Sequence, residues 1–208
     1  MSKFKKIASG YTKIILEKNG YEQKRDIFFV KSISSEMLFG ILYEEGVGGF
    51  KNHFTMVFTL DPRDVPQDEI ANATFTYLDE VHTSKKNRQF IKSISGLDYG
   101  WFNFTTEKDI EKLLKQVTDF ALQNIVEHFE DINTRELFEK RIMTGKHPFI
   151  KINGDATLVD FFHGHFALNR GDKEKANKHF NLILSNQLEK KRNSFIYKES
   201  EIALNKIL

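Results

Sequence analysis

The segment of residues 160–180, DFFHGHFALNRGDKEKANKHF, carries three of the seven histidines and is the densest group of side chains able to do chemistry. Successive helical residues point about 100° apart, so His163 and His165 cannot hold one ion from a single helix. Asp160 and His163 do have a ligand spacing, and His179 could approach from a following helix. These three residues could bind one ion only if the two helices that carry them crossed at a particular angle. We therefore expect the histidines to pack at a seam between helices, with no metal and no cofactor.

A second group of candidate residues is acidic and follows an apolar run. The segment 61–69, DPRDVPQDE, clusters acids, but its two prolines and its spacing exclude a standard calcium loop. Carboxylates at the end of a strand can act as general acid and base, which makes Asp61 and Asp64 the acidic pair to test. The alternative, which we expect, is a solvated turn in which Asp61 caps its own backbone.

A glycine-rich segment, EEGVGGF (44–50), is the candidate binding loop. It lacks the Lys-Ser/Thr pair that a phosphate loop places at the start of a helix, so we interpret it as a mobile connection between two strands. Gly46, Gly48, Gly49 and Phe50 are the predicted binding residues, with Phe50 as an exposed anchor.

Composition excludes several classes of protein. The chain has no cysteine, which removes disulfides, thiolate nucleophiles and cysteine-ligated zinc, and favours a reducing cytoplasm. A net charge of +2 is too small to indicate a strongly charged partner such as a nucleic acid. The basic start, MSKFKKIASGY, lacks the apolar core of a signal peptide, and no apolar run approaches about 18 residues. We expect a cytoplasmic protein without a membrane partner.

Two segments interleave basic and aromatic residues as binders of single-stranded nucleic acid do: KKNRQFIK (85–92) and EKKRNSFIYK (189–198). Nucleic-acid binding would require both segments on one continuous face. Surface charge beside core aromatics explains the pattern without a ligand, so we do not expect a nucleic-acid partner.

The first half of the chain has the pattern of a sheet with covering helices, and the 20 phenylalanines of the whole chain suit the space between a sheet and its helices. A helix is predicted from Phe4 to the Asn19-Gly20 stop. Strands are predicted at 25–33, 36–44, 52–61, 89–94 and 99–104, the third with one buried face because its apolar residues alternate. Residues 67–88 indicate only irregular structure or a short helix.

The second half reads as helical. A capping box of Thr106 and Asp109 opens a helix to about residue 125, and Asn133 with Glu136 starts another that ends at Gly145. Helical stripes follow at 156–170, 173–186 and 193–207. The predicted fold is α+β: an antiparallel sheet of four to five strands covered by helices (residues 1–145), followed by an all-helical C-terminal unit (residues 146–208).

Two resemblances accompany these patterns. The stretch GHFALNRGDKEKANKHF resembles a single tetratricopeptide-type helical hairpin, with small residues at Gly164, Ala167 and Ala176 and Phe180 on the second helix. No second copy is visible, so a peptide-binding array is not implied. Residues 1–145 resemble an uncharacterised family of small bacterial α+β domains noted beside toxin–immunity genes, in the order of EKNGYEQKRDIFFVK, FTMVFTLD and IVEHFEDINTRELFEK. That family implies no catalytic residues.

No motif in the chain forces one reaction. We therefore expect a non-enzymatic module that binds another protein, with an immunity-type protein that blocks a partner's active site as one form of it. The alternative is a small hydrolytic or metal-assisted enzyme, with Asp61 and Asp64 or His163 and His165 in a cleft between the sheet domain and the helical tail. A concave pocket in which these polar groups converge would favour the enzyme. The partner and the oligomeric state do not follow from the sequence.

Overall fold

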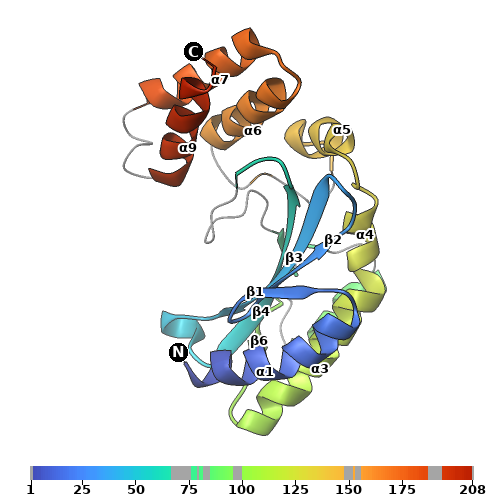
Figure 1. The fold of residues 1–208 in the computed structure, drawn as a ribbon. Coiled ribbons are helices and arrows are strands. Elements are labelled where there is room, and N and C mark those ends of the chain that lie inside the picture. Colours follow the sequence, from blue (N-terminus) through green and yellow to red (C-terminus); the bar gives the residue numbers. More distant parts are fainter. Residues whose placement is uncertain are drawn as a thin grey trace.

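A computed structural model describes residues 2–66, 76–78, 80–81, 85–95, 100–147, 152, 156–186 and 194–207 of the chain. Figure 1 shows a twisted sheet with helices packed against one face, and a group of helices from the C-terminal part at one end. This arrangement confirms the predicted α+β class and its helical C-terminal region.

Six strands of the sheet lie among the described residues, and all are antiparallel to their neighbours. The order is β1 (Glu22–Arg25), β2 (Phe28–Ser32), β3 (Met37–Glu45), β4 (His53–Pro62) and β5 (Thr76–Tyr77), and β6 (Phe102–Asn103) also pairs with β4. The predicted hairpin of β2 and β3 is confirmed, with register from Phe28↔Leu42 to Ser32↔Leu38. The very short β1 and β5 are absent from the sequence prediction.

The central strand β4 is buried on both faces, so the prediction of one buried face is wrong. Thr55 is 0% and Thr59 is 1% exposed, although both belong to the polar side of the alternation. Chain from outside the sheet lies against this second face, because Thr55 donates a hydrogen bond to the Gly100 carbonyl (2.8 Å).

Two helices cover the apolar face of the sheet, as predicted. Helix α1 (Lys3–Lys18) begins at the Ser2 cap and ends at Asn19, and α3 (Glu107–Asn124) begins with both hydrogen bonds of the predicted capping box. Aromatic rings fill the space beneath them: Phe4 stacks on Phe54 with centroids 5.1 Å apart. The Tyr43 hydroxyl shares a buried hydrogen bond with Thr118 of α3 (2.6 Å).

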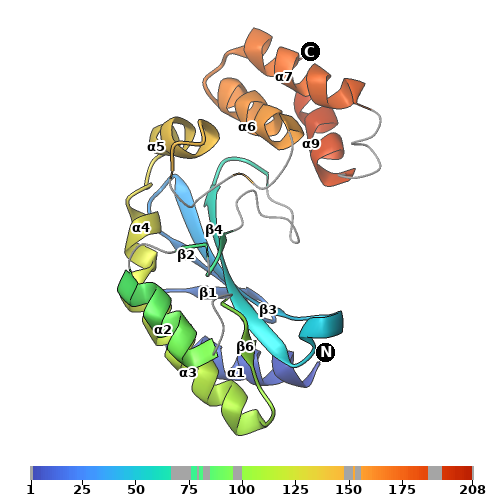
Figure 2. The same cartoon turned by 180° about the vertical axis from the view of Figure 1, so that it is seen from behind.

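Residues 89–94, predicted as a strand, lie instead in helix α2 (Lys85–Ser95), which packs beside α3 (Figure 2). The spacing of Phe90, Ile91 and Ile94 fits a helix as well as a strand. Stacking of Phe90 on Phe120 of α3 (4.3 Å between ring centroids) stabilises the helix. Within the ambiguous stretch 67–88, residues 76–77 form β5 and residues 85–88 begin α2, while 67–75, 79 and 82–84 lie outside the described residues.

The C-terminal part begins with short helical turns. Helix α4 (Val126–Glu130) is followed by α5 (Arg135–Phe138), which continues as a π-helical turn (Glu139–Met143). The cap of α5 is Thr134 rather than the predicted Asn133, because the Thr134 hydroxyl accepts from the Leu137 N–H. The three predicted helical stripes form α6 (Ala156–Asn169), α7 (Lys173–Ser185) and α9 (Ser194–Asn205).

The helical tail is joined to the sheet domain through α5. The Phe138 ring packs on Phe162 of α6 with centroids 5.2 Å apart, and Arg170 pairs with Glu139. Buried residues of both halves belong to one continuous apolar cluster. A boundary at residue 145 therefore stays a prediction. Among the described residues, no helix has the length and apolarity needed to cross a membrane.

Candidate functional site

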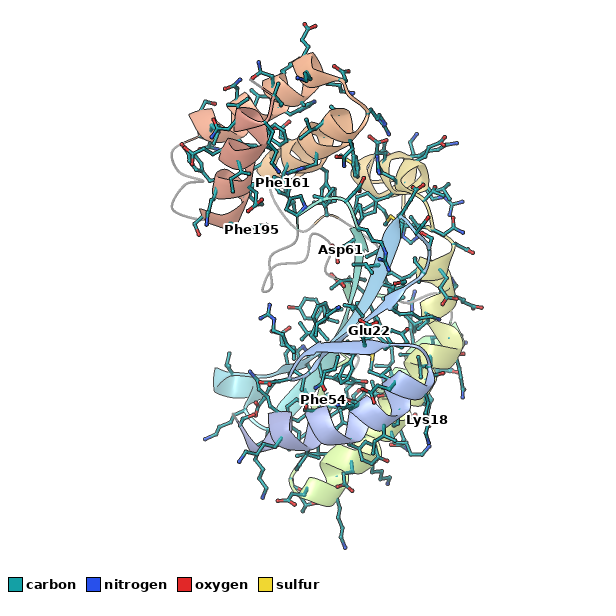
Figure 3. The ribbon with its side chains drawn as sticks, viewed as in Figure 1. Lys18, Glu22, Phe54, Asp61, Phe161 and Phe195 are labelled. Carbon is teal, nitrogen blue, oxygen red and sulfur yellow. The ribbon has the colours of Figure 1, made fainter. Side chains whose placement is uncertain are left out.

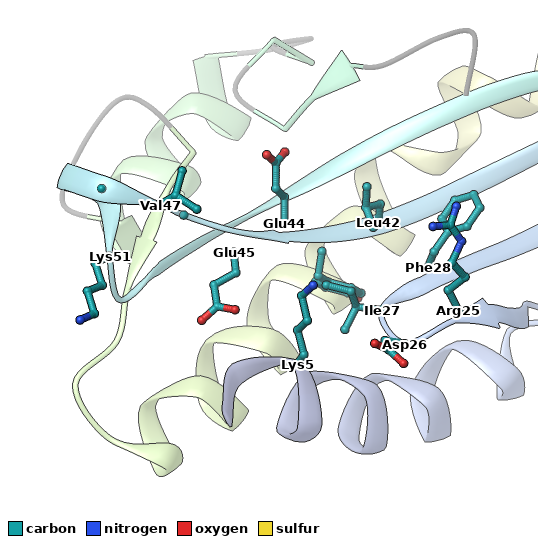
Figure 4. Close-up of a pocket in the computed structure, with 13 residues that line it drawn as sticks. Lys5, Arg25, Asp26, Ile27, Phe28, Leu42, Glu44, Glu45, Val47 and Lys51 are labelled. Carbon is teal, nitrogen blue, oxygen red and sulfur yellow. The ribbon is translucent and has the colours of Figure 1, made fainter. Parts of the chain in front are cut away.

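A cavity of about 690 Å³ lies where β3 runs past the end of β2 (Figure 4). It is lined by Lys5, Arg25, Asp26, Ile27, Phe28, Leu42, Tyr43, Glu44, Glu45, Gly46, Val47, Gly48 and Lys51. Two of the predicted binding residues, Gly46 and Gly48, are therefore in its wall. Gly49 is exposed nearby, and the side chain of Phe50 lies outside the described residues.

The cavity exists because two paired strands differ in length. The chain turns back after β1 at Asp26 and Ile27, so β2 starts only at Phe28, whereas β3 continues to Glu45. The last hydrogen bond between the two runs from the Tyr43 N–H to the Ile27 carbonyl (3.1 Å). Beyond it, β3 pairs with β4 on one side, and no described strand pairs with it on the other.

The free side of β3 presents backbone groups. The Gly46 N–H donates to His53 of β4 (2.8 Å), and successive residues of an antiparallel strand direct their backbone groups to opposite sides. The N–H and C=O of Glu45 therefore point away from β4, and no described residue pairs with them. Val47 follows in extended backbone (φ −120°, ψ 160°) and is 84% exposed.

The apolar part of the cavity lies on the face turned away from α1 and α3. Phe28 and Leu42 are cross-strand neighbours there and are half-buried. Gly40 makes room for this arrangement: a Cβ at Gly40 would lie 2.7 Å from the Phe28 ring and 2.3 Å from Thr59 Oγ1. The glycine lets the Phe28 ring lie across β3 beside the cavity.

The charges that line the cavity cancel. Lys5, Arg25 and Lys51 contribute three positive charges, and Asp26, Glu44 and Glu45 contribute three negative charges. Glu45 accepts a hydrogen bond from the Ser2 hydroxyl at the start of α1. In Figure 4, Lys5 rises from α1 toward the strand edge beside Glu45, and Glu44 points to the opposite face.

The two candidate acids have separate environments. Asp61 lies within β4 opposite Leu38 and is 4% exposed, so the expectation of a solvated turn is wrong for this residue. Figure 3 shows it at the end of the sheet nearer the helical tail. Asp64 lies in the following turn, where it pairs with Arg135 and accepts a hydrogen bond from Asn169 (2.9 Å). Asp64 therefore links the sheet domain to α5 and α6.

Three of the predicted polar residues of the tail do meet. His163 stacks on His179 with ring centroids 5.1 Å apart, and His179 donates from Nδ1 to the Asp160 carboxylate (2.9 Å). The nitrogen lone pairs of stacked rings lie in nearly parallel planes, so they do not point at a common ion. Burial lowers the pKa of His163. Among the described residues, no three histidine or acidic side chains form a possible metal site.

His165 lies apart from the pair of stacked histidines, in the aromatic interior of the tail. Phe161 and Phe180 meet its ring edge to face, at centroid distances of 4.5 and 5.0 Å. Burial lowers the pKa of His165 to about 4, so the ring is neutral at pH 7. Its Nε2 atom is buried without a hydrogen-bond partner among the described residues.

The sequence located the loop of this site but not its other walls. Lys5, Asp26 and Phe28 line the cavity only because the tertiary fold brings them there. The predicted strands 25–33 and 36–44 have equal lengths, so the sequence did not indicate that β3 extends beyond β2. Comparison of the chain with family models, with curated proteins and with solved structures gives no match.

Proposed function

We propose that the protein is a non-enzymatic module that binds another protein through the end of β3 and the loop after it. We call this region, residues 42–51 with the facing Lys5 and residues 25–28, the β3-end surface. The observation that carries the proposal is the cavity of about 690 Å³ at a strand end whose backbone has no described residue paired with it on one side. Concave sites of this size bind ligand groups of other molecules.

The candidate catalytic residues make contacts typical of structural residues, which favours a binding role over an enzymatic one. Asp64 is engaged by Arg135 and Asn169, and His165 is enclosed by aromatic rings. The wall of the cavity at the end of β3 includes none of Asp61, Asp64, His163 and His165. The β3-end surface carries no net charge, which favours a protein partner over the phosphates of a nucleic acid.

An immunity-type protein is the form of this function that the order of parts in residues 1–145 suggests. Its partner would be a toxin whose active site the β3-end surface covers, and both would meet in a bacterial cytoplasm. The helical tail would then support the sheet rather than contact the partner.

Site-specific photocrosslinking in the native cells tests the proposal. A photoreactive amino acid replaces Val47, which is 84% exposed on the surface, or Ile14, an exposed control on α1 at 61%. We expect one crosslinked protein from the Val47 position and none from Ile14, and the purified partner should bind the wild-type chain with fixed stoichiometry. Equal crosslinking from both positions, or none from Val47, would contradict the proposed function.

A further inference from the structure

We propose that the β3-end surface binds its partner by strand addition: an extended segment without charged residues, in which apolar and polar side chains alternate, pairs with the backbone of Glu45 and Val47. This inference rests on the proposed function and specifies the kind of segment that the surface takes.

The backbone supplies the first argument. An added strand needs donors and acceptors on alternate residues of the edge it joins. Glu45 offers both its N–H and its C=O on the free side, and no described residue bonds the N–H of Val47. Val47 itself has the extended backbone (φ −120°, ψ 160°) that strand pairing requires. The partner segment would continue the line of β2 beyond Ile27, where the described residues leave a cavity.

The side chain of Val47 supplies the second argument. Natural sheet edges are usually protected from pairing by charges, prolines or coverage. Here the last extended residue is a β-branched apolar one, 84% exposed and placed between Gly46 and Gly48. A valine on an unpaired edge favours association with another strand.

The side chains around the edge set the chemistry of the partner. Partner residues that point away from α1 would meet the half-buried Phe28 and Leu42, which favours apolar side chains there. Alternate residues would point toward α1, where Lys5 and Glu45 both line the cavity (Figure 4) and, with opposite charges, favour an uncharged polar side chain.

The balance of charge completes the description. Three cations and three anions line the cavity, so no long-range field draws a charged ligand to it. Affinity should come from backbone hydrogen bonds and apolar contact, and should change little with salt. A strongly salt-dependent partner, such as an acidic peptide, does not fit this surface.

The probe is a synthetic peptide of about eight residues that alternates threonine with valine, a length within the range of natural strands. N-methylation of alternate residues blocks one edge and prevents self-assembly, and leaves the other edge free to pair. The control peptide is methylated at every residue and cannot donate to β3. We expect the first peptide to bind and to slow hydrogen exchange of the Glu45 and Val47 amides, and the control not to bind.

Two variants of one residue separate backbone pairing from side-chain contact. Val47→Pro removes the N–H, whereas Val47→Thr keeps it together with a β-branched shape. We expect Val47→Pro to weaken peptide binding by about tenfold or more, and Val47→Thr by no more than about threefold. Circular dichroism and the unfolding midpoint of both variants should match the wild type.

The outcomes distinguish the inference from the function beneath it. Equal affinity of the two variants, binding of the fully methylated peptide, or no binding of the half-methylated one would overturn strand addition. If Val47 still crosslinks a partner in cells after such a result, the protein-binding function stands and only its mode is wrong. If neither peptide nor partner binds, both fail.

Discussion

Replacing Gly164 of α6 by alanine tests how closely the two helices of the tail approach. A Cβ at Gly164 would lie 2.6 Å from Cε1 and 2.9 Å from Cζ of Phe180. Those are contacts that real Cβ atoms do not make. Phe180 is 0% exposed and its ring is packed against His165, so it cannot swing aside freely.

The expected size of the effect follows from two opposing terms. Over-packing a buried site costs about 1–3 kcal/mol, and replacing glycine by alanine inside a helix contributes about 1 kcal/mol of stability. We expect Gly164→Ala to lower the free energy of unfolding by about 1 kcal/mol net. Gly10→Ala in α1 is the matched control, because nothing lies within 4 Å of its added Cβ. There the propensity gain should appear alone, as a stabilisation of about 1 kcal/mol.

Urea denaturation of both variants gives the comparison directly, as midpoints at unchanged slope. A double variant, Gly164→Ala with Phe180→Leu, removes the ring atoms that clash and should recover part of the loss beyond additivity. If Gly164→Ala were as stabilising as Gly10→Ala, the close approach of α6 and α7 at this point would be refuted.

Three other perturbations have outcomes set by single contacts. Burial lowers the pKa of His165 from 6.5 to about 4, so between these values the unfolded chain binds a proton that the folded chain does not. Stability should fall as pH drops through that window, by on the order of 3 kcal/mol, and His165→Leu should remove this part of the pH dependence in urea titrations. Asp64→Asn weakens the partly exposed pair with Arg135, and should cost about 1 kcal/mol at low salt and less at high salt; equal losses at both would contradict an ionic link. Thr118→Val leaves the buried Tyr43 hydroxyl without its partner and should cost about 1–3 kcal/mol, most of which Tyr43→Phe should restore in the double variant, as thermal unfolding can show.

The parts of the fold that follow from local pattern were predictable. The capping box of Thr106 and Asp109 opens α3, and the Asn19-Gly20 stop closes α1. Residues 89–94 were mispredicted because a short apolar pattern fits both a strand and a helix, and only packing of Phe90 on Phe120 decides between them.

The candidate site was predictable only in part, for a related reason. Three glycines mark the loop after β3, and that signal is local. The free edge at Glu45 depends on where β2 begins, which the turn at Asp26 and Ile27 determines. The burial of Asp61 likewise depends on neighbouring strands, and no local pattern reports it.

Hydrogen exchange of backbone amides in the free protein tests the central claim most directly. Gly46 donates to His53 and Tyr43 donates to Ile27, so both amides should be protected. Glu45 lies between them in the strand, and its amide should exchange rapidly because nothing in the described part of the chain accepts from it. Protection of the Glu45 amide equal to that of the Tyr43 and Gly46 amides would show that the end of β3 is already paired and closed to a partner.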